Sequence, residues 1–272
     1  MEPRAAFARL FGAPRALIGM VHVGALPGSP AAHHPIERLV EHAVAEARAF
    51  RDAGFTAIAI ENMHDRPYLK GGVGPEVTAA MAVIGREVRR ETDLLLGVQV
   101  LAGANREALA VAQACGAAFV RVEGFVFAHV ADEGLIEASA GELLRYRRAI
   151  GAEHVRVFAD VKKKHAAHAL TADVSLAETA RAAEFFMADG VIVTGGATGE
   201  PATRGDVSAV VSATKLPVLV GSGITPANVD HYAHAQGFIV GSALKQGGVW
   251  SNPLDADALR SMVAAFTALP KA

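Results

Sequence analysis

The chain has 272 residues, of which 51% are hydrophobic and 20% charged, with 26 Lys and Arg against 28 Asp and Glu. A single α/β barrel commonly takes about 250 residues, so the length allows one barrel or two smaller domains. The near balance of charge, with no basic cluster among aromatic residues, argues against a nucleic-acid-binding protein. No apolar run reaches the roughly 18 residues that span a bilayer, which argues against membrane insertion.

Cysteine content and the first residues bear on the location of the protein. The single Cys115 excludes an intrachain disulfide and lies in a helical pattern, where a buried apolar role is favoured over a nucleophilic one. Residues 1–15 carry arginines and scattered apolar residues but no continuous apolar segment of signal-peptide length. We therefore expect a soluble, cytoplasmic protein.

Short β-branched runs alternate with amphipathic segments, the pattern typical of βα units around a parallel sheet. The predicted strands are 16–23, 57–62, 94–100, 118–124, 155–162, 190–195, 217–223 and 237–242. The predicted helices are 36–53, 75–91, 105–115, 139–150, 175–188, 203–214, 225–233 and 255–268. Eight units of near-equal length without a linker predict a single (β/α)8 TIM barrel over 1–272, with a short N-terminal extension at 1–15. A doubly wound open sheet is the alternative.

The strand patterns assign polar side chains to the barrel interior. Successive residues of a barrel strand face the helices and the barrel interior in turn. Where bulky apolar residues occupy every second position and face the helices, the residues between them therefore face the interior. The residues placed inside by this rule are Glu61, Gln99, Arg121, Glu123, Asp160 and Lys162. They lie near the C-terminal strand ends, where such barrels build active sites, and buried charges need partners. We expect them to pair around a ligand; structural ion pairs lower in the barrel, or a misjudged parity on one strand, are the alternatives.

Histidines at two strand ends add candidate acid–base groups. His22 ends the first strand, and His165 follows the lysines of the fifth. Neither HxH nor HExxH spacing occurs, so no dedicated cofactor site is predicted. A divalent metal site is nevertheless an alternative, with ligands from four residues on neighbouring strands: His22, Glu61, Glu123 and Asp160.

Glycine-rich turns after the last strands predict an anion site. Glycine permits close backbone approach, free N–H groups at a helix start attract phosphate, and TIM barrels commonly bind phosphate after strands seven and eight. Here VGSGITPANV and VGSALK follow these strands, TGG follows the sixth, and Thr225 with Pro226 marks a helix start. The predicted phosphate-binding residues are Thr194, Gly195, Gly221, Ser222, Gly223, Gly241 and Ser242. Tight-turn packing of the glycines is the alternative.

Several segments together resemble the BtpA family: IGMVHVGALPGSP, AIAIENMHDRPY, KKKHAAHAL, TGGATGEP, and VGSGITPANV followed by GFIVGSALKQGGVW. The resemblance covers nearly the whole chain and implies a barrel of the ribulose-phosphate-binding superfamily. Cyanobacterial members are named for photosystem I assembly or stability, whereas other bacterial members are described as enzymes, sometimes as nucleosidases. No catalytic residue is carried over from the family.

Two functions remain open from the sequence. The first is an enzyme that acts on a phosphorylated sugar, nucleoside or related anionic metabolite by nucleosidase, isomerase or lyase chemistry. Its catalytic candidates are Glu61, Asp160, Lys162, His165 and His22. Its substrate-binding candidates are Asn62, Gln99, Arg121, Glu123 and Lys164, and which fifth-strand lysine enters the site is open. The second function is a non-catalytic assembly factor that retains a ligand pocket, and either form allows a homo-oligomer.

Overall fold

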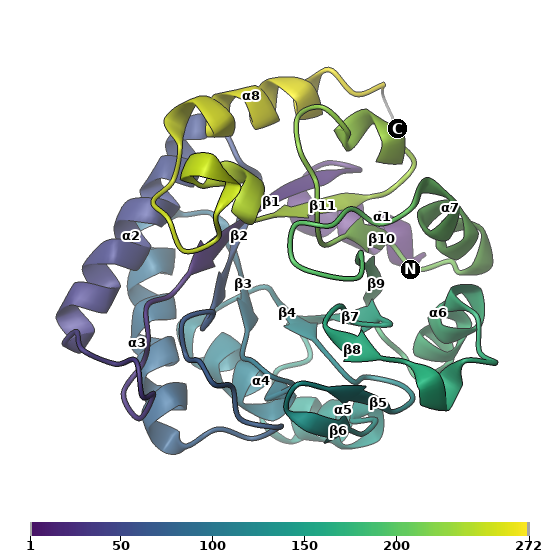
Figure 1. Cartoon of the computed structure of the whole chain (residues 1–272), viewed down its shortest axis with the longest axis horizontal. Coiled ribbons are helices and arrows are strands. Elements are labelled where there is room, and N and C mark those ends of the chain that lie inside the picture. The colour runs from purple at the N-terminus through teal and green to yellow at the C-terminus, as the bar shows by residue number, and fades with distance from the viewer. Residues whose placement is uncertain (1, 271–272) are drawn as a thin grey trace.

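Eight parallel strands close into a barrel in the computed structural model, which describes residues 2–270 (Figure 1). Around the barrel the strands follow the order β1-β11-β10-β9-β7-β4-β3-β2. Their bounds are β1 Ala16–His22, β2 Ala57–Glu61, β3 Leu95–Gln99, β4 Phe119–Val122, β7 Arg156–Val161, β9 Gly190–Val193, β10 Val218–Val220 and β11 Gly237–Val240. The predicted (β/α)8 fold is therefore confirmed.

Helices surround the barrel and begin within one residue of the predicted positions, with one exception. They are α2 Ile36–Ala53, α3 Pro75–Thr92, α4 Asn105–Cys115, α5 Ala140–Ala149, α6 Leu176–Phe185, α7 Arg204–Ala213 and α8 Ala256–Thr267. None of the helices within residues 2–270 is both long and apolar enough to cross a membrane.

The exception is the helix predicted at 225–233, which is wrong. Only the short 3-10 helix Val229–Tyr232 follows β10. The Asn228 side chain accepts a hydrogen bond from Thr225 N at 2.8 Å and donates one to Gly223 O at 2.8 Å. Because this side chain satisfies the local backbone, the segment forms a turn in place of the first helical turn.

The N-terminal extension contains a helix that the sequence analysis did not predict, α1 Pro3–Phe11. Its Phe7 and Phe11 are buried at the N-terminal end of the barrel. The Phe7 ring centroid lies 6.0 Å from that of Phe158, and the Phe11 centroid lies 5.9 Å from that of Phe119. Aromatic packing therefore fills this end of the barrel interior.

A small antiparallel sheet also went unpredicted. It joins β5 His129–Ala131, β6 Gly134–Ile136 and β8 Ala166–Ala167 in the order β6-β5-β8. Because β5 and β6 belong to the loop after β4 and β8 belongs to the loop after β7, the sheet ties two long loops together. This sheet borders the C-terminal mouth of the barrel on the side of β4 and β7.

Candidate functional site

A cavity of about 230 Å³ opens at the C-terminal mouth of the barrel, and we call it the mouth cavity. Four ionisable side chains line it: His22, Glu61, Arg121 and Lys164. Other parts of its wall are the turns at 221–225 and 241–243, which follow β10 and β11. The cavity thus brings ionisable groups together with backbone turns.

Arg121 reaches the mouth cavity from β4 and is held there by Asp160 of β7. The guanidinium donates from Nε to Asp160 Oδ1 and from Nη2 to Asp160 Oδ2, both at 3.0 Å. Burial alone would lower the pKa of Arg121, but the Asp160 carboxylate raises it above its usual value. Since both oxygens of Asp160 are engaged, this residue positions Arg121 and is not placed as a free general base.

Glu61 ends β2 and is buried beside the cavity. Burial raises the pKa of its carboxyl group, although the positive charges of Lys164 and Arg121 oppose the shift. Its Oε2 lies 3.9 Å from His22 Nε2. A carboxyl group with a raised pKa next to a proton acceptor is suited to general acid–base chemistry.

His22 ends β1 with a fixed tautomer. Its Nδ1 lies 2.9 Å from Trp250 O, and since a carbonyl oxygen only accepts, Nδ1 carries the proton. Burial lowers the pKa of His22 to about 4, against the effect of that hydrogen bond. The ring is therefore neutral at pH 7 and presents the Nε2 lone pair to Glu61.

The three lysines after β7 have different partners, and Lys162, predicted to face the barrel interior, does not line the mouth cavity. β7 ends at Val161, and Lys162 adopts a left-handed backbone with φ of 54°, which breaks the strand alternation. Its amine donates to Thr171 O, outside the mouth cavity. Lys164 lines the cavity instead and donates to Thr198 Oγ1 at 3.1 Å. Burial lowers the pKa of Lys164, and Arg121 lowers it further.

Glu123 and Gln99 belong to a separate buried network. Lys163 Nζ donates to Glu123 Oε2 at 3.0 Å, and Gln99 Nε2 donates to Glu123 Oε1 at 3.4 Å. Burial raises the pKa of Glu123, which Lys163 opposes. None of these three residues lines the mouth cavity, so their placement does not support the substrate-binding role expected of Glu123 and Gln99.

Asn62 and His165 hold loops. Asn62 donates to Asp65 Oδ2 at 2.9 Å and accepts from Leu101 N at 2.7 Å, which uses both ends of its amide. His165 Nε2 accepts from Thr198 N at 3.0 Å, so its ring fastens the loop after β9. Neither side chain lines the mouth cavity, and their predicted roles in binding and catalysis gain no support from their positions.

Several of the predicted phosphate-binding groups already form hydrogen bonds within the protein. Ser222 Oγ accepts from Gly195 N at 2.7 Å and donates to Glu200 O at 2.8 Å, and Gly221 N donates to Val193 O. Thr194 Oγ1 is buried without a partner in the described structure and does not line the cavity. The Ser222 hydroxyl and the Gly221 N–H are thus engaged within the turns, and the Thr194 hydroxyl lies outside the mouth cavity.

Free donors lie one or two residues further along each turn. The cavity-lining N–H groups of the two turns that donate to no other residue within 2–270 include those of Gly223, Ile224, Ser242 and Ala243. A Cβ at Gly223 would lie 2.2 Å from Pro201 N, and one at Gly241 would lie 3.2 Å from His22 Nε2. Glycine is needed at position 223, where backbone atoms approach so closely and φ is 63°, whereas a side chain at position 241 would require a small shift of His22. Ile224 and Ala243 were missed because a backbone donor has no residue-type signature.

No group of three or more His, Cys, Asp or Glu side chains in the described residues is arranged to hold a metal ion. Of the four residues considered for a divalent ion, Glu123 is paired with Lys163 and Asp160 with Arg121. The structure therefore does not bring this set together as ligands.

The fold and the mouth cavity define a TIM barrel with a candidate ligand site at its C-terminal mouth. Similar solved structures include phosphoribosyl anthranilate isomerase from Thermus thermophilus, with a TM-score of 0.56 at 13% identity over 94% of this chain and 100% of that one. Orotidine 5′-phosphate decarboxylase from Pyrococcus horikoshii gives a TM-score of 0.57 at 14% identity, over 93% of this chain and 100% of the other. At such identities these similarities show the fold.

The chain belongs to the BtpA family, whose model matches residues 13–268. An uncharacterized mitochondrial protein of Caenorhabditis elegans is 46% identical over 94% of each chain. The photosystem I biogenesis protein BtpA of Synechocystis is 36% identical over 88% of this chain and 83% of its own. The family resemblance expected from the sequence is confirmed.

Proposed function

We propose that the protein is an enzyme that acts on a small phosphorylated metabolite in the mouth cavity. The observation that carries the proposal is that free backbone donors after β10 and β11 line the same cavity as Glu61, His22, Arg121 and Lys164. A cavity of about 230 Å³ is smaller than the pockets of about 300–1,000 Å³ that hold drug-sized ligands, so its occupant is a small metabolite such as a sugar phosphate.

Each wall has a separate role in this proposal. The N–H groups of Gly223, Ile224, Ser242 and Ala243 bind the phosphate, since convergent amide donors stabilise an anion. Arg121 and Lys164 neutralise negative charge on the substrate. Glu61 donates a proton and neutral His22 accepts one, which isomerase, lyase and nucleosidase reactions all require.

The names of fold relatives support this substrate class. Phosphoribosyl anthranilate isomerase and orotidine 5′-phosphate decarboxylase are both named for phosphorylated compounds. The reaction of this chain, and its cytoplasmic location, stay predictions from its sequence.

Crystals soaked with inorganic phosphate or ribose 5-phosphate test the phosphate site. Density is expected between the turns at Gly223 and Ser242, and an empty cavity at millimolar ligand would overturn the proposal. Neighbouring lysines offer a matched pair of variants. Lys164→Met should weaken phosphate binding about tenfold by removing one charge beside the anion, whereas Lys162→Met, whose amine lies outside the cavity, should leave it unchanged.

Catalysis is tested once a metabolite screen by thermal shift has found a ligand, because binding stabilises the native state. Glu61→Gln keeps the shape of the side chain but removes its proton transfer, so turnover should fall about 100-fold or more. Unchanged turnover in this variant would show that the assigned role is wrong.

The second candidate function is a non-catalytic assembly factor, which the name of the Synechocystis relative favours. A factor of this kind binds its metabolite without converting it, and binding changes the affinity for a partner protein. A stabilising metabolite that returns chemically unchanged from prolonged incubation with the protein would support this function over the enzyme.

A further inference from the structure

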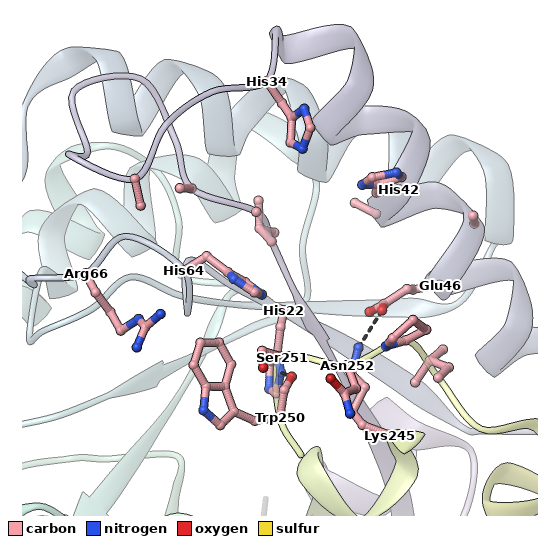
Figure 2. Close-up of a pocket in the computed structure, with 18 of the residues that line it drawn as sticks. His22, His34, His42, Glu46, His64, Arg66, Lys245, Trp250, Ser251 and Asn252 are labelled. Atoms are coloured by element: carbon pink, nitrogen blue, oxygen red, sulfur yellow. Dashed lines mark hydrogen bonds and ion pairs between the residues drawn. The ribbon is translucent and has the colours of Figure 1, made fainter. Parts of the chain in front are cut away.

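A second and larger cavity of about 680 Å³ adjoins the first, and we call it the α2 cavity (Figure 2). It lies between α2, the loop after β1 and the segment 245–254, and small side chains such as Ala43, Ala45 and Ala49 leave its α2 side open. His22 lines both cavities, so its imidazole forms a wall shared by the two. The volume falls within the range of small-molecule sites.

An aromatic wall forms one side of the α2 cavity. The ring centroids of His64 and Trp250 lie 4.8 Å apart, and the Arg66 guanidinium lies 5.0 Å from the indole centroid (Figure 2). These two neighbours hold the indole, and the hydrogen bond from His22 to Trp250 O anchors its backbone. Burial lowers the pKa of His64 to about 4, so this wall is built from uncharged imidazole and indole rings at neutral pH. Preorganised rings of this kind favour a planar apolar ligand.

The opposite side carries one unsatisfied acceptor. Glu46 of α2 forms a partly buried ion pair with Lys245 through its Oε1 atom (Figure 2). Its Oε2 atom is also buried and makes no hydrogen bond of normal geometry within the described structure, although the backbone of His22 lies near enough to the carboxylate to oppose the rise in its pKa that burial causes. A buried acceptor without a partner is costly, and an N–H group of a ligand would satisfy it.

We propose that the α2 cavity binds a planar ring that carries an N–H donor, attached to the sugar phosphate held in the mouth cavity. Trp250 and His64 form the wall on one side of the ring, Glu46 accepts its N–H from the other side, and His22 lies where the two parts of the ligand join. The substrate class is thus a phosphorylated sugar that carries a nitrogen heterocycle. This inference rests on the proposed function of the mouth cavity.

Tryptophan fluorescence tests the inference directly, because Trp250 is the only tryptophan in the chain. The probes are inorganic phosphate, ribose 5-phosphate and adenosine 5′-monophosphate, titrated into the full-length protein, with affinities measured in parallel by calorimetry. We expect the nucleotide to quench Trp250 and to bind at least tenfold more tightly than ribose 5-phosphate. The other two probes should bind with little change in fluorescence.

Two matched variants separate the cavities. Ala45→Phe, on an exposed position of α2, fills the α2 cavity, while Ala79→Phe makes the same change on an exposed position of α3 away from both cavities. Ala45→Phe should weaken nucleotide binding about tenfold and leave ribose 5-phosphate binding unchanged, and Ala79→Phe should affect neither.

Failure of the inference differs from failure of the proposed function. If ribose 5-phosphate binds but the nucleotide binds no more tightly and leaves Trp250 unchanged, the ring site is overturned and the mouth site stands. Equal weakening by both variants also overturns the ring site. If none of the three probes binds, both proposals fail together.

Discussion

The two ends of the barrel are filled with opposite kinds of side chain. At the N-terminal end, Phe7 and Phe11 of α1 pack on Phe119 and Phe158. At the C-terminal end, Arg121 and Asp160 lie on the same strands as those two phenylalanines, two residues further along each strand. Because side chains alternate along each strand, the same inward face carries packed phenylalanines at one end and a buried ion pair at the other.

This difference shows that apolar packing and buried charges are kept at opposite ends of one barrel. The apolar end gains free energy from burial and needs no partner atoms. The charged end loses solvation and is tolerated only where each charge is paired or free to meet a ligand. Substitutions at the two ends, ranked by their expected effect on the free energy of unfolding, test this difference.

The largest effect is expected for Arg121→Met. The variant leaves Asp160 buried without its partner, which should lower the free energy of unfolding by about 4 kcal/mol in urea titration. Arg156→Met is the control at the other end of β7, where the pair with Asp189 is partly exposed and should contribute under about 1 kcal/mol. Similar losses in both variants would contradict the contrast between the two ends.

A slightly smaller loss is expected at the apolar end. Phe7→Ala removes a buried ring from α1 and should cost about 3 kcal/mol. Phe185→Ala, with that side chain 83% exposed, should cost almost nothing. If Phe7→Ala unfolds at the same denaturant concentration as the wild type, α1 does not help to hold the barrel together.

The third effect depends on pH. Because the pKa of His22 falls from 6.5 in the unfolded chain to about 4 in the folded one, its contribution is complete above pH 6.5 and is lost as pH falls towards 4. Compared with the wild type, His22→Gln should lose about 2 kcal/mol less between pH 8 and pH 5. Parallel stability curves for the two proteins would show that His22 is not held neutral by the fold.

The smallest expected effect is a slight gain in stability, in the variant Glu61→Gln. The pKa of Glu61 is raised by burial, so its contribution is complete below the unfolded value of 4.5 and is lost as pH rises through the folded value. Glu61→Gln cannot ionise and should be no less stable than the wild type at pH 8, with a slight gain. A marked loss of stability at pH 8, measured in urea, would mean that the ionised carboxylate is favourable in the folded protein.

Regular alternation made much of the barrel predictable, and its interruption marks where prediction failed. Glu61, Arg121 and Asp160 lie inside because they continue strands with clear apolar parity. Lys162 follows the last residue of β7, where a left-handed backbone interrupts the strand alternation, and its amine bonds to the following loop. Nothing in the run of three lysines distinguishes Lys163 and Lys164, whose surroundings come from other loops.

Other features were missed for different reasons. The spacing of Phe7 and Phe11, four residues apart, places both on one helical face and could have revealed α1. Trp250 carries no local signal of its contact with His22, since 228 positions separate them along the chain. Contacts over such distances follow from closure of the barrel and not from any local pattern.

The hydrogen bond from His22 to the Trp250 carbonyl also determines when the mouth cavity is completed during synthesis of the chain. During synthesis, β1 leaves the ribosome long before its neighbour β11 and the segment that carries Trp250. Until then the imidazole of His22 has no fixed tautomer and the barrel is open. The orientation of His22 in the mouth cavity is therefore fixed only when these two distant parts of the chain meet.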